Sequence, residues 1–290
     1  MTAALAAEQA TPPEGVTPAD WERVLARRRQ EAPPVGADPE AAVTALSRLG
    51  PELRAGQVLV SADEVQVRQP AKGQFHELRT ARVATAQGYR YLCGTGTLFG
   101  QELWLLILLC GGARGLVTFV SDGGRWLREF VREWLVRLPW VEVILDWYHL
   151  VKKCRDRISR MGGSRAEKEA LRQAVLGALW RGEIDQALAH LDDYRATAKQ
   201  VEPLEQLQGY LETRRASLPN YRERRARQQY IGSGQAEKAN DLLVARRQKN
   251  RGMHWRIETS EALARLKLLQ LNHEWNAYWA DGQLPSLVAH

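Results

Sequence analysis

Cysteine is scarce in this chain of 290 residues, which contains only Cys93, Cys110 and Cys154. An odd number of cysteines without Cys-x-x-Cys spacing argues against a disulfide framework and against a zinc site built from paired cysteines. This usage fits a reducing compartment, where free thiols persist.

Long apolar runs are also missing from the sequence. The longest, Leu103 to Cys110, is far short of the roughly 20 residues that a helix needs to cross a bilayer. The N-terminus lacks a charged region followed by an apolar one, so we expect no signal peptide. These absences predict a cytoplasmic protein without membrane contact.

Acidic residues are few between Arg214 and Arg256, a segment that contains twelve lysines and arginines but only three acids. This local excess of nine positive charges is larger than the net +7 of the whole chain. Clustered positive charge favours an anionic partner, and nucleic acid is the commonest one. The residues from which we expect DNA phosphate contacts are Arg214, Arg215, Arg222, Arg224, Arg225, Arg227, Lys238, Arg246, Arg247, Lys249 and Arg251.

Hydrophobic periodicity and turn residues indicate a mixed order of strands and helices. The predicted strands are 58–67, 77–85, 88–94, 116–121 and 141–145. The predicted helices are 17–29, 38–50, 101–110, 125–137, 148–161, 166–181, 184–199, 203–216, 234–252 and 260–279. The run 101–110 could be a buried strand, but its leucines and the following Gly-Gly pair favour a helix.

The order of these elements is that of a ribonuclease H-like α/β fold. We expect a mixed five-stranded sheet with helices on both faces, an all-helical insertion and C-terminal helices. The predicted segments are a disordered N-terminus (1–16), a short helical segment (17–57), the ribonuclease H-like core (58–161), the insertion (162–231), C-terminal helices that complete the core (232–280) and a tail (281–290).

Three acidic residues stand where a metal-dependent nuclease would need them. Asp63 lies in an apolar strand, Asp122 ends another strand before Gly-Gly, and Glu237 opens a basic helix after Gly-Ser-Gly. Mg²⁺ prefers oxygen ligands. Three carboxylates can hold two such ions and support phosphoryl transfer. Strand alternation directs Glu64 to the opposite face from Asp63, so we interpret Glu64 as structural.

Four motifs in order resemble the bacterial insertion-sequence transposases of the DDE class, related to the Mutator-like and hAT groups. Ser61-Ala62-Asp63 resembles the segment with the first acid, and Ser121-Asp122-Gly123-Gly124-Arg125-Trp126 the segment with the second. Asp146-Trp147-Tyr148-His149 resembles the [C/D]-x-x-H motif downstream. Gly232-Ser233-Gly234-Gln235-Ala236-Glu237 resembles the approach to the third acid. The resemblance covers about residues 58–280.

The resemblance implies a DDE transposase in which Asp63, Asp122 and Glu237 are the catalytic residues and hold two Mg²⁺ or Mn²⁺ ions. It implies accessory roles for Asp146 and His149 near the active site. The implied partners are transposon-end DNA, target DNA and at least one further copy of the chain, in a nucleoid-associated cytoplasmic protein.

Three alternatives follow from the same residues. One is a helical interaction protein whose acids are incidental, which failure of the three acids to cluster would favour. The chain could be another ribonuclease H-like nuclease, which would cleave without joining strands. It could also be a truncated, non-catalytic DNA-binding remnant of a transposase. Metal-dependent nicking of a labelled DNA end separates the remnant from both enzymes.

Overall fold

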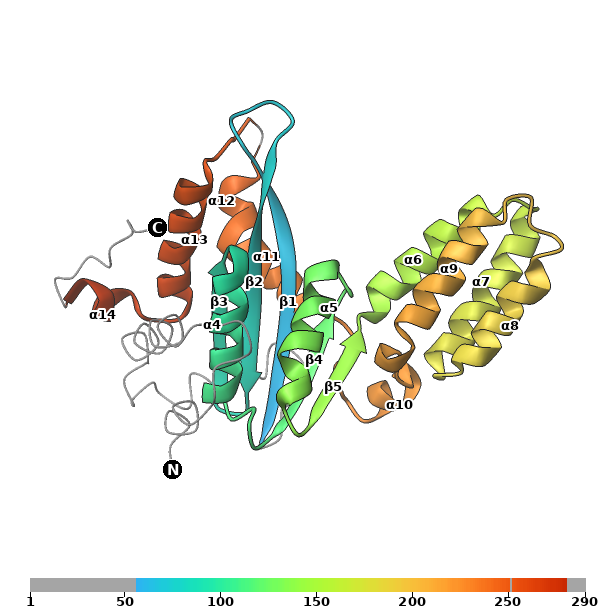
Figure 1. Ribbon diagram of the computed structural model, residues 1–290, viewed down its shortest axis with the longest axis horizontal. Coiled ribbons are helices and arrows are strands. Elements are labelled where there is room, and N and C mark those ends of the chain that lie inside the picture. The colour runs from blue at the N-terminus through green and yellow to red at the C-terminus, as the bar shows by residue number, and fades with distance from the viewer. Residues whose placement is uncertain (1–55, 251, 281–290) are drawn as a thin grey trace. The chain divides into compact units, whose positions relative to one another are not determined.

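The computed structural model describes residues 56–250 and 252–280 (Figure 1). The predicted N-terminal disorder, the two helices at 17–29 and 38–50, and the tail at 281–290 lie outside these residues, as does Arg251.

Five strands form one mixed sheet in the order β3-β2-β1-β4-β5 (Figure 1). The strands are β1 (Gln57–Arg68), β2 (Phe75–Thr85), β3 (Gly88–Gly94), β4 (Leu116–Ser121) and β5 (Val141–Leu145). β1 pairs antiparallel with β2, and β2 antiparallel with β3. The five predicted strands are therefore confirmed, and the bounds of β3, β4 and β5 are those predicted.

One face of the sheet packs against helices formed by the C-terminal part of the chain. The register pairs Asp63 with Thr80 and Val65 with Leu78, so these side chains share a face. Val65 and Leu78 belong to a buried cluster with Leu243 from the π-helical segment η3 (Asp241–Ala245). That segment lies between α11 (Gly234–Asn240) and α12 (Arg246–Gln248), and α13 (Ile257–Leu271) packs on β3. Asp63 thus faces the helix that carries Glu237.

Helices cover the other face of the sheet as well (Figure 1). They are α4 (Gly96–Leu109) and α5 (Arg125–Glu133), the latter followed by the 3-10 turn η1 (Leu135–Arg137). α4 is apolar along nearly its whole length, and Phe130 of α5 packs at a tilt against Phe119 of β4. The prediction of a helix in the ambiguous run 101–110 is confirmed.

The remaining helices run from the end of β5 almost to the start of α11. They are α6 (Trp147–Arg160), α7 (Arg165–Trp180), α8 (Ile184–Tyr194), α9 (Glu202–Thr213), the 3-10 turn η2 (Arg215–Ser217) and α10 (Tyr221–Ala226). α8 is shorter than predicted, and α10 was not predicted. The predicted helix 260–279 is two helices, α13 and α14 (Trp275–Ala280), separated at His273 with its positive φ of 60°.

The chain divides into two units, which we call the sheet unit and the helical unit. The helical unit consists of Val120–Gly124 and Glu142–Ser233, and the other described residues form the sheet unit. The helical unit therefore starts before the expected insertion at 162 and includes α6. Within the described ranges, none of the helices combines the length and apolar character needed to traverse a lipid bilayer.

Candidate metal and nucleic-acid site

Asp63 is half-buried in β1, and both of its carboxylate oxygens accept hydrogen bonds. Oδ1 accepts from the backbone N–H of Glu64 at 2.8 Å, and Oδ2 accepts from Nδ2 of Asn240 at 2.6 Å. Each carboxylate oxygen can accept more than one hydrogen bond, so these two bonds do not by themselves prevent cation binding. The side chain is held in place but can still bind a cation.

Asn240 connects two strands to the end of α11. Its amide oxygen accepts a hydrogen bond from the Thr80 hydroxyl, while its nitrogen donates to Asp63. Asn240 is 9% exposed, so these two bonds replace contacts that water would otherwise make. The sequence analysis did not single out Asn240. Its signal is the spacing of three residues after Glu237, which puts both on one side of a helix.

Glu237 and Asp63 line the same pocket, although they are far apart in the sequence. Glu237 is exposed in the first turn of α11, and the Arg82 guanidinium of β2 donates a hydrogen bond to Gln235, two residues before Glu237. The pocket has a volume of about 440 Å³. Its lining residues are Asp63, Glu64, Val65, Gln66, Glu237, Asn240, Asp241, Ala245 and Lys249.

The donor set of this pocket suits a hard divalent cation. Carboxylate and amide oxygens are the ligands that Mg²⁺ takes, and this ion keeps several waters while using one or two protein carboxylates plus substrate phosphates. Asp241 is partly neutralised, because Arg246 lies 2.7 Å and Lys238 3.9 Å from it. Across the described ranges, no three His, Cys, Asp or Glu side chains gather closely enough to hold a metal ion by themselves. A metal in this pocket would therefore need further ligands beside Asp63 and Glu237, such as water or a bound phosphate.

Asp122 follows β4 and belongs to the helical unit. Its Oδ1 accepts the backbone N–H of Gly124 at 2.8 Å. Gly123 has a φ of +74°, and a Cβ there would lie 2.9 Å from Nε of Arg214, so the turn requires glycine. Asp122 lies in one unit and Asp63 and Glu237 in the other, so the expected meeting of the three acids stays a prediction.

Asp146 and His149, the predicted accessory residues, contact each other. Nδ1 of His149 lies 3.1 Å from Oδ2 of Asp146, which is almost fully buried. Asp146 also caps α6 by accepting the backbone N–H of Tyr148 at 2.6 Å, and it accepts both the N–H and the hydroxyl of Ser233. It therefore fixes the segment that leads to Glu237.

The hydrogen bonds at Asp146 outweigh the effect of its burial. Burial by itself raises the pKa of a carboxyl, but the contacts from His149 and Ser233 lower the pKa of Asp146 to about 2. Burial likewise raises the pKa of Tyr210 to about 12. The positive charge of Arg214 opposes this rise, and the charges of Asp122 and Asp146 add to it. Of these charged groups, Arg214 lies directly over the Tyr210 ring, 3.9 Å from its centroid.

Several basic residues of the predicted DNA-binding set form hydrogen bonds or ion pairs within the protein. Arg214 donates to the Gly123 carbonyl at 3.1 Å and lies over the Tyr210 ring. Arg215 is paired with Asp185 and Glu212. Arg227 pairs with Glu223 at 3.2 Å on the exposed side of α10.

Arg224 corrects the predicted set. It is 6% exposed, its guanidinium pairs with Glu142, and its Nε donates to the Tyr230 carbonyl at 3.0 Å. A buried and paired guanidinium cannot contact DNA phosphate, so Arg224 is structural. Arg222, Arg225, Arg247 and Lys249 remain exposed, and Lys249 lines the pocket with Asp63.

Comparison with known proteins gives no family model that matches this chain and no curated protein that matches its sequence.

Proposed function

We propose that this chain is the catalytic domain of a DDE transposase with a ribonuclease H-like fold, which cleaves DNA at insertion-sequence ends and joins the ends to target DNA. The observation that carries the proposal is the pocket in which Asp63 and Glu237 meet, with the Asn240 amide fixing Asp63. The sheet order β3-β2-β1-β4-β5 supports it, because β1, with Asp63, is the neighbour of β4, which Asp122 follows.

In this proposal Asp63, Glu237 and Asp122 bind two Mg²⁺ or Mn²⁺ ions. Such a pair activates a water and stabilises the leaving oxygen in phosphoryl transfer. Water oxygen bonds to phosphorus, the bond from phosphorus to the 3′ oxygen breaks, and that oxygen takes a proton. The freed 3′-hydroxyl then attacks a phosphate of target DNA in the same way. Asn240 holds Asp63, and Lys249 neutralises phosphate at the rim.

Cleavage and joining can be tested on a plasmid that carries the DNA flanking the coding region. We expect Mg²⁺-dependent nicks at the element ends, followed by covalent joining of those ends to a second DNA. Asp63→Asn and Glu237→Gln should lower the nicking rate by at least about 100-fold, as expected when a catalytic metal ligand is lost. Both variants should keep DNA affinity within about twofold.

Glu129→Gln is the matched control, because it neutralises an exposed carboxylate of α5 that is paired with Arg125. It should nick at the rate of the unaltered protein. Nicking without joining would favour a ribonuclease H-like nuclease that only cleaves. DNA binding without any nicking in Mg²⁺ or Mn²⁺ would contradict the catalytic proposal and favour a DNA-binding remnant.

A further inference from the structure

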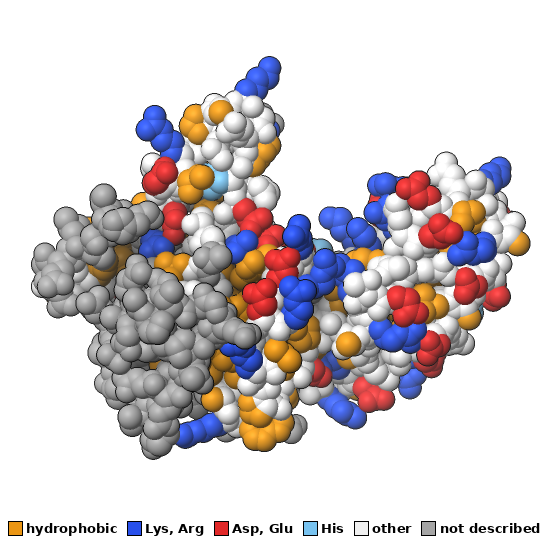
Figure 2. Space-filling model, viewed as in Figure 1, with side chains coloured by type: hydrophobic (Ala, Val, Ile, Leu, Met, Phe, Trp, Pro, Cys, Tyr) orange, Lys and Arg blue, Asp and Glu red, His pale blue; other side chains and the backbone are white. Residues whose placement is uncertain are grey.

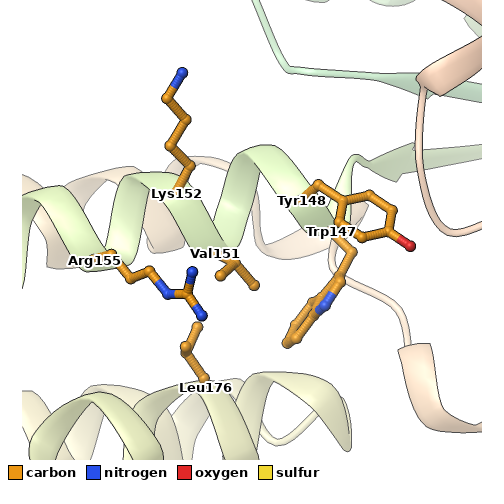
Figure 3. Close-up of a pocket in the computed structure, with 6 residues that line it drawn as sticks. All are labelled: Trp147, Tyr148, Val151, Lys152, Arg155 and Leu176. Atoms are coloured by element: carbon orange, nitrogen blue, oxygen red, sulfur yellow. The ribbon is translucent and has the colours of Figure 1, made fainter. Parts of the chain in front are cut away.

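The helical unit contains a cavity between α6 and α7, distinct from the pocket with Asp63. It has a volume of about 480 Å³, within the roughly 300–1,000 Å³ of sites that take small organic groups. The lining residues are Trp147, Tyr148, Val151, Lys152, Arg155 and Leu176. Figure 3 shows Arg155, Val151 and Leu176 turned toward the space between the two helices, with Trp147 near the start of α6.

The aromatic part of this cavity is held rigidly. The Trp147 ring lies 4.8 Å from Trp180 and 4.9 Å from Tyr221, measured between ring centroids. Tyr221 is itself buried and donates its hydroxyl to the Leu145 carbonyl at 2.7 Å. A ring fixed in this way loses little conformational freedom when another flat group binds to it.

Tyr148 presents an open aromatic surface beside Trp147. A Cβ at Gly232 would lie 2.8 Å from two carbons of the Tyr148 ring, so the ring rests against the Gly232 backbone. Its other side is open, because the side chain is 63% exposed. An exposed aromatic ring supported on one side is suited to stacking with a nucleic-acid base.

The cations of the cavity have no protein partners among the residues that the structure describes. α6 carries five lysines and arginines and one acid, Asp156, which pairs with Arg160. Lys152 and Arg155 are exposed and make no ion pair or hydrogen bond in the described part of the chain. In Figure 3 Arg155 reaches into the space between the helices, whereas Lys152 points outward from α6.

The surface of α7 to α9 has a different character. Figure 2 shows basic and acidic side chains interspersed over that end of the helical unit, and several form pairs, such as Arg181 with Glu183 and Arg195 with Glu205. Many of the charges on that end of the helical unit are therefore paired, in contrast to Lys152 and Arg155 on α6.

From this cavity we infer a binding site for single-stranded DNA, with an unpaired base against Tyr148 and Trp147 and the adjoining phosphates at Arg155 and Lys152. Flat aromatic groups and unpaired cations on one helix, α6, match the alternation of base and phosphate along a strand. Bases in a duplex are already stacked and paired, so a duplex cannot fill the cavity. The inference rests on the proposed function only in taking DNA as the ligand, and it needs no metal.

The test measures fluorescence anisotropy with a labelled 15-nucleotide thymidine strand and with an abasic strand of equal charge, both in EDTA. Tyr148→Ala should weaken binding of the thymidine strand about 5- to 150-fold, the range for loss of one stacked base. It should change binding of the abasic strand by less than about twofold. Tyr148→Phe keeps the ring and should bind like the unaltered protein.

The paired change Lys152→Gln and Arg155→Gln tests the phosphate contacts. The slope of log affinity against log salt should become shallower by about 1.4, because each single-strand phosphate contact contributes about 0.7. Arg165→Gln is the matched control, since Arg165 is an exposed cation of α7 outside the cavity. It should leave the slope unchanged.

Three outcomes would overturn the inference. They are an equal effect of Tyr148→Ala on both strands, an unchanged salt slope in the double variant, and equal affinity for a polyglutamate peptide of the same charge. EDTA removes metal-dependent cleavage from the measurement, so failure of the catalytic proposal leaves this result interpretable. Melting curves check that each variant is folded.

Discussion

Asn240 is the single side chain on which the position of Asp63 depends most directly. It receives a hydrogen bond from Thr80 and donates one to Asp63, and all three contribute to the sheet unit. Asn240→Leu keeps a similar volume but removes both bonds, leaving buried polar groups without partners. We expect a loss of about 1–3 kcal/mol in the free energy of unfolding, measured by urea denaturation.

The double variant Asn240→Leu with Thr80→Val provides the control. Because the Thr80 hydroxyl has no partner once Asn240 is gone, removing it should recover part of the loss, with a coupling of about 0.5–3 kcal/mol. Strictly additive effects of the two changes would mean that the bond between Thr80 and Asn240 contributes nothing. Asn240→Leu should also weaken Mn²⁺ binding, because it removes the hydrogen bond that holds Oδ2 of Asp63 in place.

The lowered pKa of Asp146 predicts that the stability of the fold depends on pH. Its pKa in the folded protein is about 2, below the ordinary 3.8, so the carboxylate contributes its full stabilisation above about pH 4. This contribution is lost as the pH falls from about 4 toward 2. Asp146→Asn should therefore lower the free energy of unfolding at pH 7 by about 2 kcal/mol and flatten its decline between pH 4 and 2.

Urea midpoints at pH 7, 4, 3 and 2.5 measure this effect. Asp156→Asn serves as the comparison, because Asp156 lies on the same helix in an exposed pair with Arg160 and exposed pairs contribute little. If Asp146→Asn shows the same acid sensitivity as the unaltered protein, Asp146 is not the group whose titration destabilises the fold.

Part of the site could be predicted at the residue scale. Asp63 and Glu237 were predictable because an acid in an apolar strand and an acid opening a basic helix are unusual by themselves. Asn240 was not, because its role depends on Thr80, which is 160 positions away in the sequence. Arg224 was misassigned because a run of arginines gives no sign that one of them faces Glu142.

Among the elements, the short helix α10 carries both a buried arginine and exposed arginines. Arg224 is buried against Glu142, whereas Arg222 and Arg225 are exposed. Arg224→Gln should reduce the free energy of unfolding by about 1–3 kcal/mol, because it removes the buried guanidinium that bonds to Glu142 and to the Tyr230 carbonyl. Arg222→Gln with Arg225→Gln should leave the melting temperature nearly unchanged and make the salt slope for duplex DNA shallower by up to about 1.8.

Thermal melts and salt-dependent anisotropy on the two variants distinguish these roles. A salt slope that stays the same without Arg222 and Arg225 would mean that α10 is a solvated surface. The exposed cations near the Asp63 pocket, Arg247 and Lys249, would then be the next place to look for the DNA path.

Strands were easier to predict from this sequence than short helices. β4 and β5 are short apolar runs bounded by glycine, proline or aspartate, so both ends have a signal. α10 has six residues, fewer than two turns, which is too short to show helical periodicity. The break between α13 and α14 occurs at His273 without a glycine or proline, so the sequence contains no turn residue that would predict it.

At the scale of the molecule, the two units each carry part of the proposed catalytic set. Asp63 and Glu237 belong to the sheet unit, and Asp122 belongs to the helical unit. The proposal requires the three to share metal ions held about 3.5–4 Å apart. Replacing Mg²⁺ with Fe²⁺ and adding ascorbate and peroxide generates radicals at the metal, which should cut the backbone near all three residues.

Mass spectrometry of the fragments measures where these cuts fall. Asp63→Asn should remove the cuts at all three places together, because they arise from one site. Cuts near Asp63 and Glu237 without any near Asp122 would show that Asp122 does not belong to the metal site.

The chain passes between the two units four times, the last time between Ser233 and Gly234. Residues leave a ribosome in sequence at about 5–20 per second, so the helical unit is fully synthesised while one face of the sheet still lacks its cover. Leu243 and Ala264 close that face, and Asn240 arrives with them. Burial of this part of the core and assembly of the Asp63 pocket therefore both wait until α11 to α13 have been synthesised. A chain interrupted before α11 has neither, so the proposed catalytic site could not form in it.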